Sequence, residues 1–274
     1  MVDMEGLAMV VWMRWAGLLL CAALAACAAP PQQPSAYPGQ EDLREPTPPH
    51  ELSPALRAAS QALLVTPQSG HAWEPFALPG KRYIQFEPAE SGGRAALLVQ
   101  AQNSVSILRQ RFEPALAAPG MLRFSWKVDA LPTGADLHDP QNEDAPVRIV
   151  LSFDGDRTRL SSQAHRLSEL SRLLTGEELP YATLVYVWST TDALGAVVPN
   201  PRTDRIRKLV VDSGTAGLGQ WREHVRDAQA DYMRVFGEPP GPLLSVALMT
   251  DTDNTQTILQ AWYGALRLDA ALLP

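Results

Sequence analysis

The sequence has very little cysteine, with only Cys21 and Cys27 among its 274 residues. Both lie near the start of the chain, so no disulfide can form within residues 28–274. Histidine is also scarce, and the five that occur are scattered singly without the spacing of zinc ligands. A domain in this chain must therefore be held by its hydrophobic core, for which its length is sufficient.

Signatures of common enzymes are missing as well. The sequence contains no G-x-S-x-G elbow, no phosphate-binding G-x-x-x-x-G-K-S/T loop and no H-E-x-x-H zinc motif. Charged residues make up only 19% of the chain, and its net charge is -7. Because an acidic chain repels phosphates, nucleic acid is not expected as a partner. The hydrophobic content of 46% is that of a globular protein.

An uncharged apolar run covers residues 15–26 and follows Arg14. It is shorter than the roughly 20 residues that cross a membrane, so residues 1–26 are predicted to be a signal peptide. Its end, LAAC at residues 24–27, resembles the lipobox of bacterial lipoproteins, which implies a lipid on Cys27. Ordinary cleavage that leaves Cys27 unmodified is the alternative.

The lipid would make the membrane a partner of the chain and place it in the bacterial cell envelope. By resemblance to such lipoproteins, the non-acidic Ala28 indicates the outer membrane, with the domain facing the periplasm. Residues 27–54 contain eight prolines and are predicted to form an extended tether after the lipidated Cys27. Residues 55–274 are predicted to form a single domain.

Short runs rich in β-branched and aromatic residues recur along this domain, separated by clusters of turn residues. We expect strands over residues 73–78, 82–86, 95–102, 104–112, 122–128, 147–153, 184–188, 206–211, 244–249 and 259–268. Residues 122–128 alternate between apolar and polar, as in a strand with one buried face. Residues 184–188 are almost wholly apolar, which predicts a central strand. The pattern predicts a mainly β, antiparallel, jelly-roll-like sandwich.

One or two helices interrupt the strands. Leucines at helical spacing between Ser161 and Gly176 predict an amphipathic helix, with Ser161 or Ser162 at its start and Gly176 at its end. Residues 221–236 fit a helical face, although their first half also fits a strand.

Eight blocks carry a resemblance to a known family. They are FSWKV at 124–128, LPTGAD at 131–136, EDAPVRI at 143–149, FDGD at 153–156, LVYVW at 184–188, TDRIR at 203–207, FGEPP at 236–240 and TDTDNT at 250–255. Together they resemble a bacterial family of exported proteins called domain of unknown function 3047. The resemblance implies a sandwich of the galactose-binding-like kind and transfers no activity and no catalytic residue.

The densest polar cluster is TDTDNT, directly after an apolar run. Asp251 and Asp253 would project from one face of a strand, and Asn254 adds an amide. Paired carboxylates bind Ca²⁺, hold sugar hydroxyls or take part in acid-base catalysis. No cofactor other than such a Ca²⁺ is expected, and Asp251 and Asp253 are its candidate ligands. The alternative is that these residues only turn the chain between two strands.

Three further residues complete the candidate binding site. Asp144 is included because it lies in one of the family blocks. Tyr186 and Trp188 share one face of the apolar strand, and an indole ring beside carboxylates would suit stacking on a sugar ring. The alternative for both aromatic residues is a place in the hydrophobic core.

Three functions are compatible with these observations. The first is a non-catalytic binding module for a glycan or envelope polymer, and it is favoured because the acidic pair has no neighbouring histidine. The second is a hydrolase acting on glycans through Asp251 or Asp253 with a third carboxylate such as Asp144. The third is an envelope scaffold whose partner is another protein.

Overall fold

The computed structural model describes residues 51–68 and 70–271. The predicted signal peptide, Cys27 and most of the predicted tether lie outside these residues. Among the described helices, none has the length and apolar character needed to cross a membrane.

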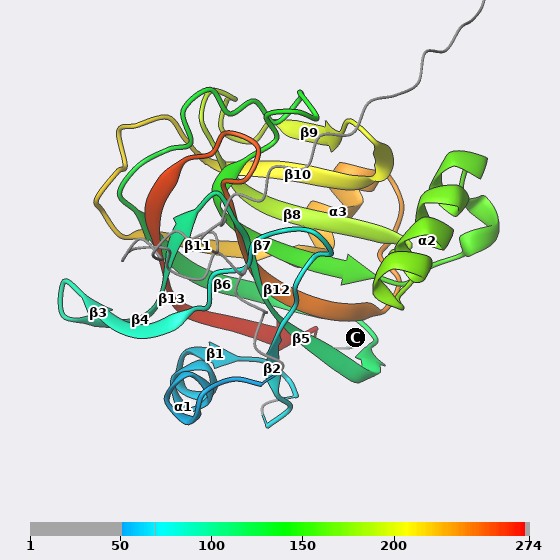
Figure 1. The fold of residues 1–274 in the computed structure, drawn as a ribbon. Coiled ribbons are helices and arrows are strands. Elements are labelled where there is room, and N and C mark those ends of the chain that lie inside the picture. The colour runs from blue at the N-terminus through cyan, green and yellow to red at the C-terminus, as the bar shows by residue number, and fades with distance from the viewer. Residues whose placement is uncertain (1–50, 69, 272–274) are drawn as a thin grey trace, which may run out of the picture. The chain divides into compact units, whose positions relative to one another are not determined.

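Two β-sheets pack face to face (Figure 1). The six-stranded sheet has the order β11-β6-β13-β4-β3, with β1 paired to β13. Its strands are β1 (Leu64–Val65), β3 (Glu87–Ser91), β4 (Arg94–Gln102), β6 (Pro119–Val128), β11 (Arg222–Asp227) and β13 (Ile258–Ala270). The seven-stranded sheet has the order β2-β5-β12-β7-β8-β10-β9. Its strands are β2 (Trp73–Pro75), β5 (Val105–Leu116), β7 (Ala145–Phe153), β8 (Ala182–Ser189), β9 (Val197–Asn200), β10 (Thr203–Ser213) and β12 (Leu243–Asp251).

The chain crosses repeatedly from one sheet to the other, as in jelly-roll sandwiches. β4 is followed by β5 in the opposite sheet, β5 by β6, β6 by β7, and β12 by β13. The predicted mainly β sandwich is therefore confirmed. Its pairing is antiparallel except for β1 with β13 and β8 with β10, which are parallel.

The expected strands agree with the observed ones over most of the sheet interiors and differ at the edges. Residues 82–86 form no strand, although Tyr83 and Phe86 are buried. β3 and β9 were not predicted, because each is a short strand at a sheet edge that contains a proline. The ambiguous residues 221–236 divide into β11 and a following helix.

The structure has three α-helices, α1 (Pro54–Leu63), α2 (Ser162–Thr175) and α3 (Ala228–Phe236). The predicted caps of α2 are confirmed, since Ser161 Oγ accepts from the N–H of Ala164 and Gly176 adopts a left-handed φ of 79°. Three of its four leucines, Leu170, Leu173 and Leu174, are exposed, and Leu173 is 76% exposed. The buried residues of α2 are the small Ala164 and Ser168.

The predicted boundary at residue 54 falls inside packed structure. Leu52 belongs to the hydrophobic core, and Ser53 Oγ accepts from the N–H of Leu56 as the cap of α1. The part of the chain that packs with the sandwich therefore begins by Leu52.

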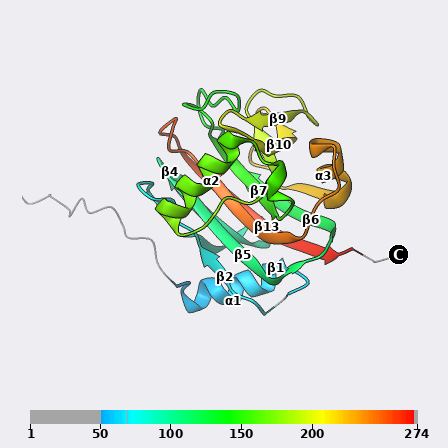
Figure 2. The ribbon, with the colours of Figure 1, turned by 90° about the vertical axis from the view of Figure 1, so that its right-hand side faces the viewer.

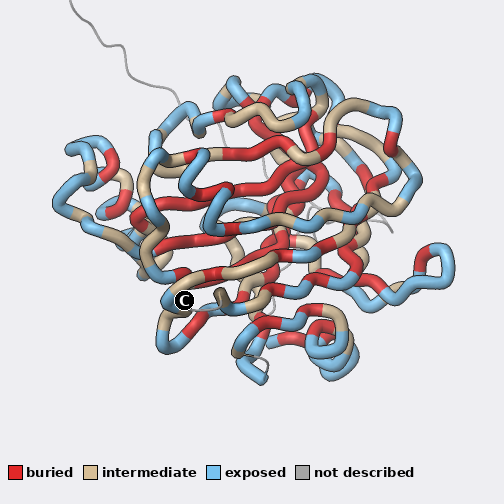
Figure 3. Tube along the Cα trace, turned by 180° about the vertical axis from the view of Figure 1, so that it is seen from behind, coloured by how far each residue is buried: buried red, intermediate tan, exposed pale blue. Residues whose placement is uncertain are grey.

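The main core lies between the two sheets and is extended by residues of α1 and α3, such as Leu56 and Tyr232 (Figure 3). β8 is buried along its whole length between β7 and β10, which confirms the predicted central strand. The other faces of the sheets are where solvent-facing sites can form.

Candidate functional site

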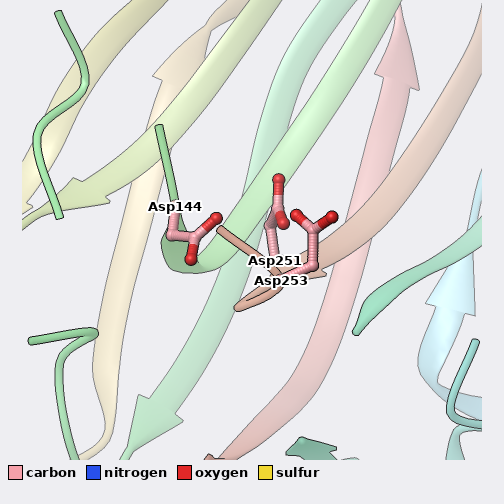
Figure 4. A group of neighbouring side chains, drawn as sticks. All are labelled: Asp144, Asp251 and Asp253. Atoms are coloured by element: carbon pink, nitrogen blue, oxygen red, sulfur yellow. The ribbon is translucent and has the colours of Figure 1, made fainter. Parts of the chain in front are cut away.

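Three aspartates meet where β7 begins and β12 ends (Figure 4). Asp251 is the last residue of β12 and pairs with Ala145, so the register brings Asp144 beside it. Asp253 lies in the turn that leads toward β13. One carboxylate oxygen from each aspartate lies within 4.8 Å of the others. The predicted pairing of Asp251 with Asp253 thus occurs, with Asp144 as a third member, although Asp253 has already left the strand.

Neighbouring residues hold each of these carboxylates. Arg148 Nη1 donates to Asp251 Oδ2 at 2.8 Å, and Lys81 forms an ion pair with Asp253. Asp144 Oδ2 accepts from the backbone N–H of Thr255 at 2.7 Å and from its hydroxyl at 2.6 Å. Asn254 contributes only its backbone N–H, 3.4 Å from Asp144 Oδ1. The alternative that these residues turn the chain between two strands is therefore correct for residues 254 and 255, which attach the β12–β13 turn to the start of β7.

Burial dominates the electrostatics of Asp251, which is only 8% exposed. It raises the pKa of this carboxyl to about 7, while Arg148 opposes the rise and Asp144 adds to it. Asp251 Oδ1 is buried and has no hydrogen-bond partner among the described residues.

Tyr186 and Trp188 lie elsewhere, inside the core between the sheets. The hydroxyl of Tyr186 donates to Asp231 Oδ2 at 2.9 Å, and Trp188 Nε1 donates to the carbonyl of Gly214 at 3.0 Å. Both side chains are buried, so neither can stack on a ligand. Their prediction as binding residues is wrong, and the core alternative is correct.

A groove of about 620 Å³ lies between the outer face of the seven-stranded sheet and α2. Figure 2 shows α2 in front of the strands. The floor is formed by outward-facing aliphatic side chains, and α2 contributes small residues to the facing wall. Examples are Ile107, Val150, Ala247 and Met249 in the floor and Ala164 and Ser168 in the wall.

Two arginine side chains that line this groove bind α2 and the residues that follow it. Arg109 donates to both carboxylate oxygens of Glu177, at 2.8 and 3.0 Å, and its guanidinium lies 4.1 Å from the centre of the Phe76 ring. Arg157 donates to Ser168 Oγ at 2.7 Å and to the carbonyl of Leu179 at 3.0 Å. Polar contacts of these arginines thus tie α2 and residues 177–179 to the rest of the domain.

Sequence reasoning missed this groove because its residues come mainly from five strands and a helix that are far apart in the sequence. One signal was available. Arg109 and Arg111 occupy alternate positions of β5, and the residues on either side of each, Leu108, Gln110 and Phe112, are buried, which places two cations on one open face.

A second exposed feature lies on the outer face of the six-stranded sheet. Trp221 and Trp262 are partly exposed there, and each lies beneath a cation. The Arg94 guanidinium is 5.7 Å from the Trp221 ring centre, and the Lys127 ammonium is 4.7 Å from the Trp262 ring centre. Each indole thus has a cation–π partner on this face.

Several solved structures resemble the chain loosely. The xyloglucanase domain of NopAA, a type three effector from Sinorhizobium fredii in complex with cellobiose, is 12% identical, with a TM-score of 0.40 over 74% of this chain and 95% of that one. A mutant family 29 carbohydrate-binding module complexed with mannohexaose is 10% identical, with a TM-score of 0.30 over 72% of this chain and 79% of that one. A cellulohexaose complex of another such mutant is 10% identical, with a TM-score of 0.30 over 75% and 87%.

No curated protein matches the sequence. A family model does match, and it covers residues 71–267, which include both the groove and the three aspartates. The resemblance stated from the sequence blocks is confirmed: the chain belongs to the family described as protein of unknown function DUF3047.

Proposed function

We propose that this chain is a non-catalytic binding module that holds a saccharide chain of the cell envelope in the groove beside α2. The observation that carries the proposal is the groove itself. Its volume of about 620 Å³ falls in the range of small-molecule binding sites, and its lining is mostly apolar with polar groups at the rim.

The chemistry of the lining suits a sugar, which has both apolar C–H surfaces and hydroxyls. Aliphatic side chains such as Val150 and Met249 offer an apolar floor. Hydroxyls from the sheet, such as those of Ser152 and Thr183, line the same space and both donate and accept hydrogen bonds. The Arg109–Glu177 pair adds planar donors and acceptors at one end.

The carboxylates that line the groove are those of Glu113, Glu177 and Glu178. None of the three clustered aspartates lines the groove. Burial in the groove acts to raise the pKa of Glu177. Hydrogen bonds and positive charge from Arg109 and Arg111 outweigh the effect of burial and hold the pKa of Glu177 below its usual value. A carboxylate held ionised in this way does not serve as a general acid.

The proposal includes the location. We place the module in the bacterial envelope, lipid-anchored through Cys27 to the outer membrane and facing the periplasm. This part rests on the apolar run at residues 15–26 and on LAAC at residues 24–27. A glycan of that compartment would lie within reach of a domain carried on the proline-rich tether.

An acyl chain is a second candidate ligand. It is favoured by the groove floor, whose only aromatic contributions are Phe76 and Phe112 among mostly aliphatic neighbours. Glycan sites more often present flat aromatic faces to the sugar ring.

The test compares two valine substitutions in the full chain. Val150→Trp fills the groove, whereas Val225→Trp places the same side chain on β11, where Val225 is 60% exposed. Titration calorimetry with soluble peptidoglycan fragments and lipopolysaccharide core oligosaccharides should show binding that Val150→Trp weakens by about tenfold or more, or ~1.4 kcal/mol. Val225→Trp should bind as the parent does.

Two outcomes would contradict the proposal. Equal affinity in the parent and Val150→Trp would remove the groove from the site, and loss of binding only in Val225→Trp would move the site to the six-stranded sheet. Displacement of a fluorescent fatty acid from the parent but not from Val150→Trp, without glycan binding, would establish the acyl alternative instead.

A further inference from the structure

We infer that Asp144, Asp251 and Asp253 form a binding site for Ca²⁺ that joins the β12–β13 turn to the start of β7. This site is separate from the groove, and its existence does not depend on what the groove binds.

The first argument is geometric. Ca²⁺ binds oxygen at 2.3–2.6 Å, so two ligands on opposite sides of the ion lie about 4.6–5.2 Å apart. One oxygen from each of the three carboxylates lies within 4.8 Å of the other two, so a single ion can reach all three.

The second argument concerns the oxygens that are left over. Asp251 gives Oδ2 to Arg148, Asp253 gives Oδ2 to Lys81, and Asp144 gives Oδ2 to Thr255. Each carboxylate therefore keeps Oδ1 available, apart from the long 3.4 Å contact between Asp144 Oδ1 and the N–H of Asn254. Protein groups thus orient the carboxylates while one oxygen of each stays open to a ligand.

The third argument is the condition of Asp251 Oδ1. This atom is buried and has no hydrogen-bond partner among the described residues. Figure 4 shows its side chain between those of Asp144 and Asp253. An unsatisfied carboxylate oxygen out of reach of water is destabilising, and a cation bound among the three side chains would satisfy it.

Charge favours the same conclusion. When all three carboxylates are ionised they outnumber the two neighbouring cations, Arg148 and Lys81, so the cluster is then negatively charged. The adjacent Glu143 does not add to it, because its carboxylate pairs with Lys208 at 2.7 Å and with Asn200 at 2.8 Å. Water and backbone carbonyls would complete the six to eight oxygens that Ca²⁺ prefers.

The experiment is calorimetric titration of the full chain with CaCl₂ after removal of metal by a chelator, together with melting curves. The parent should bind one Ca²⁺ and melt several degrees higher in its presence. Asp253→Asn and Asp144→Asn should each weaken binding by about tenfold or more. Lys81→Met is the matched control, because it breaks the ion pair with Asp253 without removing a ligand, and it should bind Ca²⁺ as tightly as the parent or more tightly.

The inference is overturned if the parent shows neither heat nor a higher melting temperature in millimolar Ca²⁺, or if Asp253→Asn binds with the parent's affinity. It is also overturned if Lys81→Met weakens binding as much as Asp253→Asn, since the ion pair and not the carboxylate would then be responsible. Should both Asp→Asn variants fail to fold, terbium luminescence of the parent, and its loss on adding Ca²⁺, decides the question.

Discussion

Arg109 is predicted to hold α2 against the sheet, and Arg109→Met tests this. The side chain is 13% exposed, donates twice to Glu177 and once to Glu74 at 3.3 Å, and lies over Phe76. Charge-assisted hydrogen bonds contribute roughly 1.5–3 kcal/mol when partly buried, and a cation–π contact contributes about 0.5–1 kcal/mol. Methionine keeps part of the apolar stem, so we expect a loss of about 2 kcal/mol in the free energy of unfolding.

The control is Arg111→Met. Arg111 pairs with the same two glutamates, but its side chain is 44% exposed, so its loss should cost less than about 1 kcal/mol. Urea denaturation measures both free energies, and hydrogen exchange of residues 162–179 reports on α2. Arg109→Met should accelerate exchange there, and Arg111→Met should not. Equal losses of stability, or unchanged exchange in Arg109→Met, would refute the view that the buried arginine fastens the helix.

Three other outcomes are expected. Because the pKa of Asp251 is raised, the folded state holds a proton that the unfolded state has released, and the melting temperature without Ca²⁺ should fall as pH rises from 5 to 8. Asp251→Asn should flatten this dependence of melting temperature on pH. An unchanged dependence would show that Asp251 is not its cause. Trp188→Ala should lose about 3–5 kcal/mol in urea denaturation because the ring is fully buried, and a loss below about 1 kcal/mol would contradict that burial. Cys27→Ala should move the protein from the membrane fraction to the soluble fraction and abolish labelling by radioactive palmitate, and persistent labelling would show that the lipid lies elsewhere.

Sequence pattern predicted the interior of the fold well because burial leaves a clear periodic signal. The alternation over residues 122–128 became β6, and the apolar run at 184–188 became the buried β8. Exposed elements leave weaker signals. The leucines of α2 were spaced as if to meet a core, yet Leu173 faces solvent because the helix packs through Ala164 and Ser168.

The candidate site was predictable only where its residues are neighbours in the sequence. Asp251 and Asp253 were found together because only Thr252 separates them. Arg148 and Lys81 were not found as their partners, because pairing between β12 and β7 and the path of the chain before β3 bring them there from over 100 residues away. Trp188 was misassigned because an aromatic side chain on a central strand has the same sequence pattern whether it faces a groove or the opposite sheet.

The order of the strands has a consequence for how this protein is made. β12 lies between β5 and β7, and β13 lies between β4 and β6, so the last two described strands occupy the middle of both sheets. Neither sheet can close until residues 243–270 have been synthesised, and the pairings they then make are with residues 90 or more positions earlier, as in Leu243 with Phe153. A nascent chain that still lacks residues 243–270 leaves β4, β5, β6 and β7 without their central partners, and unpaired strand edges of this kind are prone to aggregation.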